Sequence, residues 1–182
     1  VTAAADIDTV IVAAGDTELT VTTTSSAEKV TGFDVLTGWV CGDGINKSDL
    51  LKIVGDGILA DGTVAGINST LKYGSSKVIK SHKVVNGIAT FDDTEIWGAA
   101  LTLPTTDIAL AAAVQYLQAN DLGDAGHLLG FLHNSNVYVF AQGSDAGTDN
   151  TLDMMVQIPS EASTLITATN SKTAHLLGVV VS

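Results

Sequence analysis

The residues best placed for chemistry surround the only cysteine, in the segment EKVTGFDVLTGWVCGDGINKSDLLKI, residues 28–53. Cys41 precedes the Gly42-Asp43-Gly44 stretch, and a thiol beside carboxylates suggests a nucleophile or a metal ligand. A reactive thiolate usually has a histidine or a second cysteine nearby to lower its pKa. Neither stands near Cys41 in the sequence. We therefore interpret Cys41 as a structural thiol and the glycine-rich stretch as a turn between strands.

Signatures of common catalytic centres are missing from the sequence. It has no Gly-x-Ser-x-Gly motif, no His-Glu-x-x-His motif and no phosphate loop. His127 and His133 are interpreted as surface histidines rather than as a metal-binding pair. Asp92, Asp93 and Glu95 form the tightest carboxylate cluster, and we expect it to be an exposed strand end. The sequence therefore predicts that this protein is not an enzyme.

Calcium is the cofactor that the acidic segments favour. Ca²⁺ binds six to eight oxygen atoms, which carboxylates and carbonyl groups in Asp/Gly/Asn segments commonly supply. The segments GSDAGTDNTLD and AAADIDTV are of this type. The alternative is that these carboxylates are solvated turn residues. The predicted ligands are Asp145, Asp149, Asp153, Asp6 and Asp8, and a calcium role also stays open for Asp34, Asp43 and Asp49.

Three aromatic residues offer a different chemistry, because sugars stack on exposed aromatic rings. They are Trp39, Trp97 and Tyr138. Packing in the core is the alternative, and for the tryptophans we prefer it. Around the cysteine we expect core anchors at Phe33, Val35, Trp39 and Leu50.

Composition narrows the classes of partner. The chain of 182 residues has a net charge of -12, and all eight of its basic residues are lysine. An acidic, arginine-free chain is a poor match for nucleic-acid phosphates or anionic lipids. No run approaches the roughly 20 apolar residues that span a bilayer, so we expect no transmembrane helix. We expect a single domain over residues 1–182 that is a fragment of a larger exported protein.

The elements that would position these residues are mostly short strands. Asn86-Gly87 lies between two β-branched runs and predicts a hairpin with a type I′ turn. A helix is expected near residues 106–120, capped by Thr105 or Thr106 and stopped at Gly123, with Leu110, Val114 and Leu117 on its apolar face. The predicted strands are 9–13, 18–24, 30–40, 50–54, 77–85, 88–91, 127–133, 137–141, 152–158, 165–168 and 176–181. The fold class is mainly β, a β-sandwich or β-roll-like domain of about ten short strands with one α-helix.

Several segments, taken in order, resemble the C-terminal region of bacterial surface proteins exported by type I secretion. VTGFDVLTGWVCGDGINKSDLLKI is similar to a motif of that region, in which an aromatic residue and a Gly-Asp turn precede an Asp-Leu-Leu run. The alanine-rich helix and the segment AGHLLGFLHNSNVYVFAQGSDAGTDNTLDMMVQI resemble its next part. The family includes surface-layer (S-layer) proteins and serralysin-type, RTX-like proteases. The strict glycine-rich nonapeptide that forms its calcium β-roll is absent.

The resemblance implies a non-catalytic, β-rich domain that is secreted to the bacterial cell surface. We expect it to act in secretion, anchoring or self-assembly, with a second copy or a cell-surface component as its partner. The alternatives are an adhesin-like or carbohydrate-binding β module and an accessory domain of a secreted hydrolase.

Overall fold

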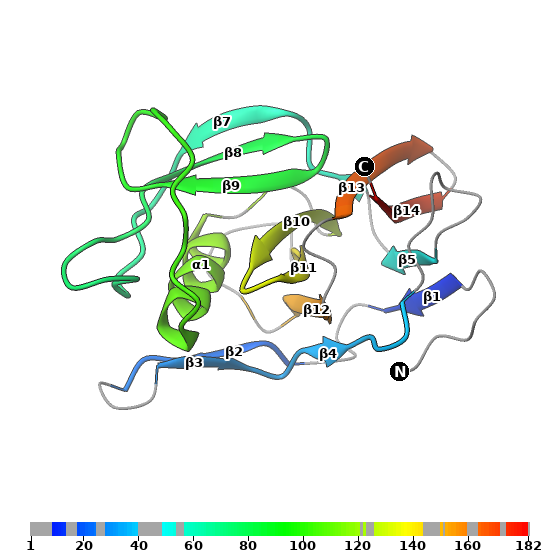
Figure 1. Ribbon diagram of the computed structural model, residues 1–182, viewed down its shortest axis with the longest axis horizontal. Helices are drawn as coiled ribbons and strands as arrows, with labels where there is room; N and C mark the ends of the chain where they lie inside the picture. The colour runs from blue at the N-terminus through cyan, green and yellow to red at the C-terminus, as the bar shows by residue number, and fades with distance from the viewer. Residues whose placement is uncertain are drawn as a thin grey trace.

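The computed structural model describes residues 9–13, 18–24, 28–39, 49–53, 57–120, 122, 126–143, 150, 152–159, 164–171 and 174–181. Over these residues the chain is mainly β with one helix, which confirms the predicted fold class (Figure 1). The described strands form sheets of four, eight and two strands. The strands are β1 Thr9–Val12, β2 Thr20–Thr22, β3 Lys29–Thr31, β4 Asp34–Val35, β5 Leu50–Ile53, β6 Gly57–Ile58, β7 Gly62–Ala65, β8 Ser81–Val85, β9 Ile88–Asp92, β10 His127–His133, β11 Asn136–Ala141, β12 Met154–Ile158, β13 Thr164–Ser171 and β14 Ala174–Val181.

The centre of the molecule is the antiparallel meander β10-β11-β12. Side chains alternate between the two faces of a strand, and in this meander both faces are buried. The face toward α1 carries Leu129, Phe131, Tyr138, Phe140 and Met155. The opposite face carries Leu128, Val137, Val139, Ala141, Met154, Val156 and Ile158. Burial on both faces explains why these strands read as continuous apolar runs in the sequence.

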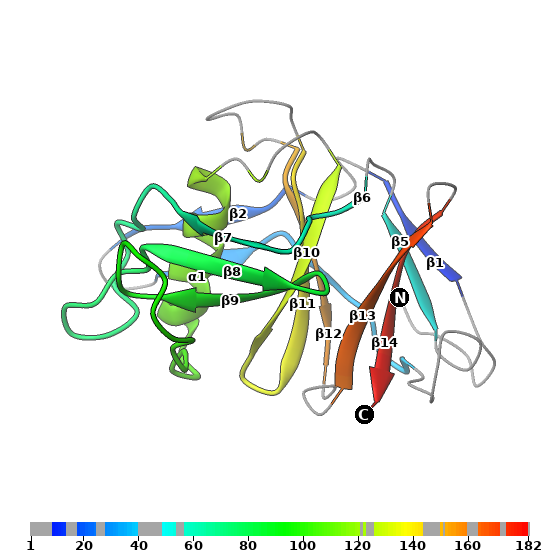
Figure 2. The same ribbon diagram turned by 90° about the horizontal axis from the view of Figure 1, so that it is seen from above.

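A second sheet, ordered β1-β5-β14-β13, covers the aliphatic face of the meander (Figure 2). Val12 of β1 and Leu51 of β5 are buried in the same cluster as the meander residues, so the two sheets form a β-sandwich. Trp39 is buried in this cluster, which confirms it as a core anchor. Val35, with 38% of its surface exposed, is not a core anchor, and Phe33 is half-buried. The side chain of Leu50 is not among those that the structure describes, so its prediction as a core anchor stays a prediction.

Helix α1, Asp107–Ala119, packs against the aromatic face of the meander and is enclosed by the β8–β9 hairpin and the β2–β3 ribbon (Figure 1). The predicted apolar face understates its burial, because nine of its residues are buried. Alanine at four of these positions lets the surrounding strands approach closely. Thr106 is the N-cap but its side chain makes no capping bond, and the helix ends at Ala119, with Asn120 rather than Gly123 as its C-terminal stop. No helix in the described ranges is long and apolar enough to span a bilayer.

The predicted Asn86-Gly87 hairpin is confirmed as β8–β9, and β7 extends it on one side. The predicted strand over residues 30–40 is wrong, because the chain there forms two short strands, β3 and β4. Gly32 separates them with a φ of 78°, and a Cβ atom there would overlap the Glu18 carbonyl group. This glycine is therefore needed for both its backbone angle and its lack of a side chain.

Candidate functional site

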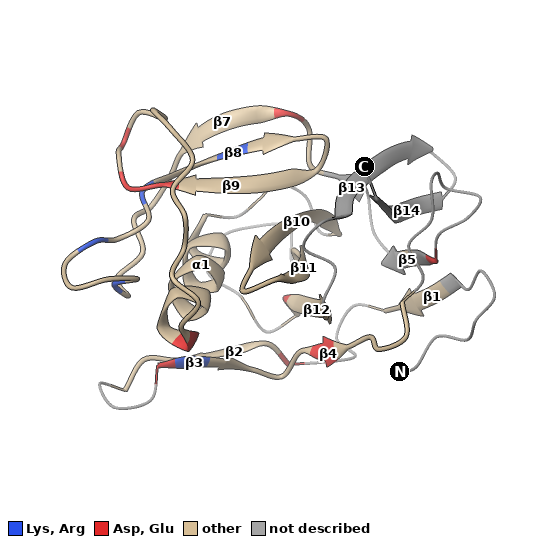
Figure 3. Cartoon of the chain, viewed as in Figure 1, with Lys and Arg blue, Asp and Glu red and all other residues tan. Residues whose placement is uncertain are grey.

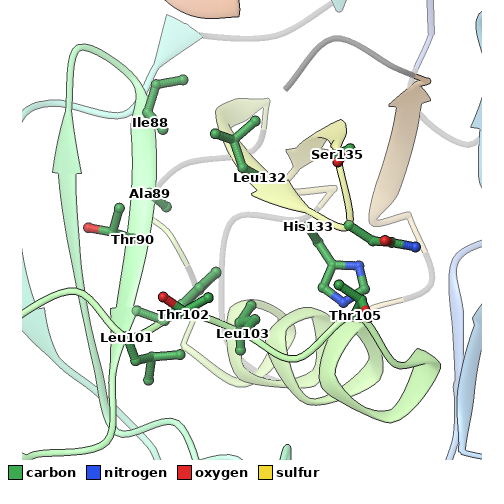
Figure 4. A pocket seen from close by; sticks show the side chains of 12 residues that line it. Ile88, Ala89, Thr90, Leu101, Thr102, Leu103, Thr105, Leu132, His133 and Ser135 are labelled. Atoms are coloured by element: carbon green, nitrogen blue, oxygen red, sulfur yellow. The ribbon is translucent and has the colours of Figure 1, made fainter. Parts of the chain in front are cut away.

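A cleft opens where the large sheet divides into two parts. β9 pairs with β10 in parallel over only two residue pairs, Ile88 with Gly130 and Ala89 with Phe131. Beyond this point β9 follows β8, while Leu101 donates its backbone N–H to the Phe91 carbonyl group at 2.9 Å. The space between β9, residues 101–105 and the β10–β11 turn is a cleft of about 350 Å³ (Figure 4).

The lining of this cleft combines apolar side chains with uncharged polar groups. Its apolar members come from β9, from the segment 101–103 and from Leu132 of β10, and hydroxyl and amide groups surround them. None of the lining residues is a carboxylate or a lysine. The lining residues are Ile88, Ala89, Thr90, Phe91, Leu101, Thr102, Leu103, Thr105, Leu132, His133, Asn134 and Ser135.

His133 fastens one wall of the cleft rather than presenting an acid or base to it. Its Nε2 donates a hydrogen bond to the Pro104 carbonyl oxygen at 2.9 Å, which ties β10 to the segment before α1. Only 5% of the residue is exposed, and burial lowers the pKa of His133, so the ring is neutral near pH 7. The expectation of a surface histidine is therefore wrong for His133. Because this ring is neutral, none of the side chains that line the cleft carries a charge near pH 7.

A second, smaller groove of about 220 Å³ lies beside the first and shares Ile88 and Thr90 with it. Val85 and Asn86, at the tip of the β8–β9 hairpin, complete its lining. Val85 and Leu132 are 44% and 45% exposed, so the apolar character continues from the cleft onto the open face of the hairpin. We call the residues that line the two grooves the uncharged surface.

Asp92, expected at an exposed strand end, is instead a buried anchor. Its Oδ2 accepts hydrogen bonds from Thr94 Oγ1 at 2.7 Å and from the backbone N–H groups of Gly98 and Ala99 at 2.7 and 3.2 Å. These bonds, the Gly98 N–H first, lower the pKa of Asp92 to about 2. The sequence prediction missed this because residues 93–99 fold back over the strand end. Asp92 therefore organises the loop that follows β9.

The other two carboxylates of this cluster pair with lysines from the segment 66–80. Asp93 accepts from Lys77 Nζ at 2.7 Å and from the Tyr73 hydroxyl at 2.9 Å, and these bonds lower the pKa of Asp93. Glu95 lies 3.5 Å from Lys80 Nζ and accepts from the Asn68 amide. Figure 3 shows these charges gathered at the ends of β8 and β9, away from the hairpin tip. The cluster therefore links the loop after β9 to the segment 66–80, and its role is structural.

Of the predicted calcium ligands, only Asp153 lies within the described residues. It is fully buried, and its Oδ1 accepts the Gly143 backbone N–H at 2.9 Å. Asp6, Asp8, Asp145 and Asp149, like Asp43, lie outside the described residues. Asp34 is half-buried in β4, and Asp49 is buried just before β5. In the described part of the chain, no three His, Cys, Asp or Glu side chains come close enough to hold a metal ion.

The aromatic residues considered for sugar stacking are mostly inside the protein. Trp39 and Tyr138 are 7% and 4% exposed, so neither offers a ring face to solvent. Tyr138 instead stacks on Phe131 at a centroid distance of 5.4 Å. Trp97 is half-buried in the loop after β9 and belongs to neither core cluster. The sequence prediction missed the uncharged surface, although the uncharged run VVNGIAT, which includes Asn86-Gly87, contains part of it.

No family model matches the chain, and no curated protein matches it in sequence.

Proposed function

We propose that this chain is a non-catalytic structural domain of a secreted bacterial cell-surface protein, of the S-layer-like kind, and that it acts through self-association. The observation that carries the proposal is the uncharged surface over the β8–β9 hairpin and the cleft beside it. The arginine-free composition and the ordered segments that resemble type I-secreted surface proteins support the secreted, cell-surface part of the proposal.

The charge of the chain explains why an uncharged surface matters for association. Two copies with a net charge of -12 repel each other over most orientations. Contact through side chains that carry no charge limits how many like charges come together, and apolar groups there gain from leaving water. The buried bonds of Asp92 and the ion pair of Asp93 also favour a structural role, because these carboxylates are already used to hold loops.

Sedimentation velocity over a wide range of protein concentration tests the proposal. We expect reversible association that strengthens with added salt, since salt screens the repulsion between acidic copies. Leu132→Asp should weaken association, because it places a carboxylate on the uncharged surface of an acidic chain. A chain that stays monomeric up to millimolar concentration, at low and at high salt, would contradict the proposal.

Calcium belongs to the same proposal as a cofactor of the acidic segments. We propose Asp145, Asp149, Asp153, Asp6 and Asp8 as its ligands, on the chemistry of their sequence context. Thermal unfolding with calcium, with magnesium and with a chelator tests this. A calcium-specific rise in Tm that Asp149→Asn reduces is expected, and identical curves in all three conditions would contradict it.

A carbohydrate-binding or adhesin-like module is a second candidate, and the cleft favours it. Thr102, Thr105, Asn134 and Ser135 supply hydroxyl and amide groups that match an uncharged polar ligand such as a sugar. Binding on a glycan array that Asn134→Ala abolishes would support this function. Silence on the array, together with association in the centrifuge, would favour the structural one.

A further inference from the structure

Strand β7, Gly62–Ala65, is the terminal strand of the eight-stranded sheet. It pairs with β8 on one side, and no other described strand pairs with its outer edge (Figure 1, top). All four of its residues are exposed, and Val64 is 47% exposed. An open strand edge of this kind presents backbone donors and acceptors to a partner.

The register shows which backbone groups point outward. In an antiparallel pair, alternate residues direct both N–H and C=O toward the partner strand. Gly66 donates its N–H to the Lys80 carbonyl group at 3.1 Å, so Gly66 and, by alternation, Val64 and Gly62 face β8. Thr63 and Ala65 therefore direct their N–H and C=O groups away from the sheet.

The composition of β7 leaves this edge unprotected. Natural edge strands are usually blocked by lysine, proline or a bulge, because an open edge recruits other chains. β7 has the sequence Gly-Thr-Val-Ala and contains none of these residues. The chain has a net charge of -12, but the residues of β7 carry no charge. A second acidic copy can therefore approach this strand edge without meeting a charge on the strand itself.

We propose that β7 of one copy pairs antiparallel with β7 of a second copy, so that two eight-stranded sheets join across a two-fold axis. This inference rests on the proposed function, because it requires two copies to associate, and it adds the open edge of β7 to the uncharged surface as a contact between them. The outward groups set the register. Thr63 of each copy exchanges hydrogen bonds with Ala65 of the other, and the two Val64 residues face each other at the axis.

The same register keeps the nearest carboxylates apart. Asp61, which is exposed and accepts the Asn86 backbone N–H, lies opposite Ile67 of the second copy. The two Asp61 residues are then separated by about six residues of strand, or roughly 20 Å. This is more than the Debye length of about 8 Å at physiological salt, so they do not oppose the pairing. The paired edge ends before Ile67, because the N–H and C=O groups of Ile67 bond the Asn120 side chain.

Two substitutions on β7 test the pairing by sedimentation velocity. Thr63→Pro removes an outward N–H that makes no bond within the sheet, a position where an edge strand tolerates proline. Val64→Lys places two ammonium groups at the two-fold axis. Each should raise the dissociation constant of the dimer at least about tenfold, Thr63→Pro through lost hydrogen bonds and Val64→Lys through repulsion between the two ammonium groups. Tm and near-UV circular dichroism verify that the variants remain folded.

Ile96→Lys is the matched control for charge. Ile96 is 86% exposed in the loop after β9, so the substitution adds the same charge to another exposed apolar position. We expect it to change the dissociation constant by less than about twofold, the range of a remote surface charge.

Disulfide trapping tests the register. In a Cys41→Ser background, Val64→Cys places two thiols at a non-hydrogen-bonded pair, where Cα atoms lie about 4.5 Å apart, within disulfide reach. Mild oxidation should give a covalent dimer in much higher yield than Ile96→Cys in the same background. Equal yields would overturn the proposed pairing.

The outcomes separate this inference from the function on which it rests. If the unmodified chain associates and Thr63→Pro and Val64→Lys associate equally well, the β7 pairing is wrong and the self-association proposal stands. If the unmodified chain does not associate, both fail. Loss of association in both folded β7 variants, with the control unchanged, supports both.

Discussion

The β8–β9 and β10–β11 hairpins share their turn geometry and differ in what covers them. Both turn over two residues with positive φ, 50° and 76° at Asn86-Gly87 and 48° and 61° at Asn134-Ser135. β10–β11 is buried on both faces, between α1 and the second sheet. β8–β9 is buried only on the face toward α1, and its outer face carries Lys83, Val85, Ile88 and Thr90.

The comparison shows that the residues that form a hairpin are not those that determine its role in the fold. The turn residues specify where each hairpin reverses, and they do so in both cases. The layers that cover the strands decide whether the hairpin stabilises the core or offers a surface. In the described part of the chain, β8–β9 has no second covering layer. This hairpin lines both grooves, the larger one together with the β10–β11 turn, and it leads to the open edge at β7.

The largest expected effect is in the doubly covered hairpin. Phe131 is fully buried and packs against Phe91 and Tyr138, with ring centroids 5.7 and 5.4 Å away. Phe131→Ala should lower the free energy of unfolding by about 3–5 kcal/mol, through lost burial and the cavity it leaves. Urea unfolding measures this, and Val85→Ala on the other hairpin, at a 44% exposed site, should cost less than about 1 kcal/mol. Similar losses at the two sites would contradict the comparison.

A smaller effect is expected at the base of the singly covered hairpin. Asp92→Ala removes the acceptor that holds the loop 93–99 to the end of β9, and it should cost about 1–3 kcal/mol. The pKa of Asp92 falls from 3.8 to about 2 on folding, so its stabilisation is complete above the unfolded pKa and is lost as pH falls from about 4 to about 2.

Urea unfolding at about pH 5 and about pH 3 checks the Asp92 prediction. The loss of stability between these values should be smaller in Asp92→Ala than in the unmodified chain. Asp93→Ala, at a more exposed carboxylate of the same loop whose pKa is also lowered, should reduce the pH dependence less than Asp92→Ala does. A variant that keeps the full pH dependence would show that other groups cause it.

Each hairpin also holds one buried histidine, which predicts a pH effect at milder acidity. His82 Nδ1 lies 3.0 Å from the Tyr116 hydroxyl in β8–β9, and His133 bonds Pro104 in β10–β11. Burial lowers the pKa of both below 6.5 in the folded chain. The unfolded chain then binds more protons as pH falls below about 6.5, so stability falls with pH, by at most about 2 kcal/mol per histidine down to pH 5.

The histidine prediction is checked by urea unfolding between about pH 7 and about pH 5, above the range in which carboxylates titrate. His82→Gln and His133→Gln should each reduce the slope of stability against pH, whatever their effect at pH 7. If neither variant reduces the slope, the histidines are not the groups responsible.

Sequence reasoning succeeded where a structure depends on neighbours in the chain. The Asn86-Gly87 turn, the paired strands 127–133 and 137–141, and the helix after Pro104 are local features, and all three are confirmed. It failed for the segment 30–40, where a glycine must pass close to Glu18, and for Val35, which solvent reaches.

The candidate site depended on contacts that no local pattern contains. The cleft exists because β9 and β10, about forty residues apart in the chain, pair briefly and then diverge. Asp92 and His133 are buried because segments 98–99 and 104 fold over them. The residue types alone favoured an exposed strand end and a surface histidine, and tertiary contacts overrode both preferences.

The smallest expected effect exchanges the second turn residue between the two hairpins. Ser135 has a φ of 61°, a conformation that costs a residue with a Cβ atom about 1–2 kcal/mol and costs glycine little. Ser135 is exposed, so Ser135→Gly changes little besides the backbone. The relief of backbone strain is partly offset by the greater entropy of glycine in the unfolded chain. The net change should raise the free energy of unfolding by about 0.5–1 kcal/mol. Gly87→Ser, the reverse change at a φ of 76°, should destabilise it by at least as much, because Gly87 is buried and a side chain there also needs space. Urea unfolding of both variants gives the two signs. Two changes of the same sign would mean that the covering layers, and not only the backbone angles, determine which residue each turn accepts.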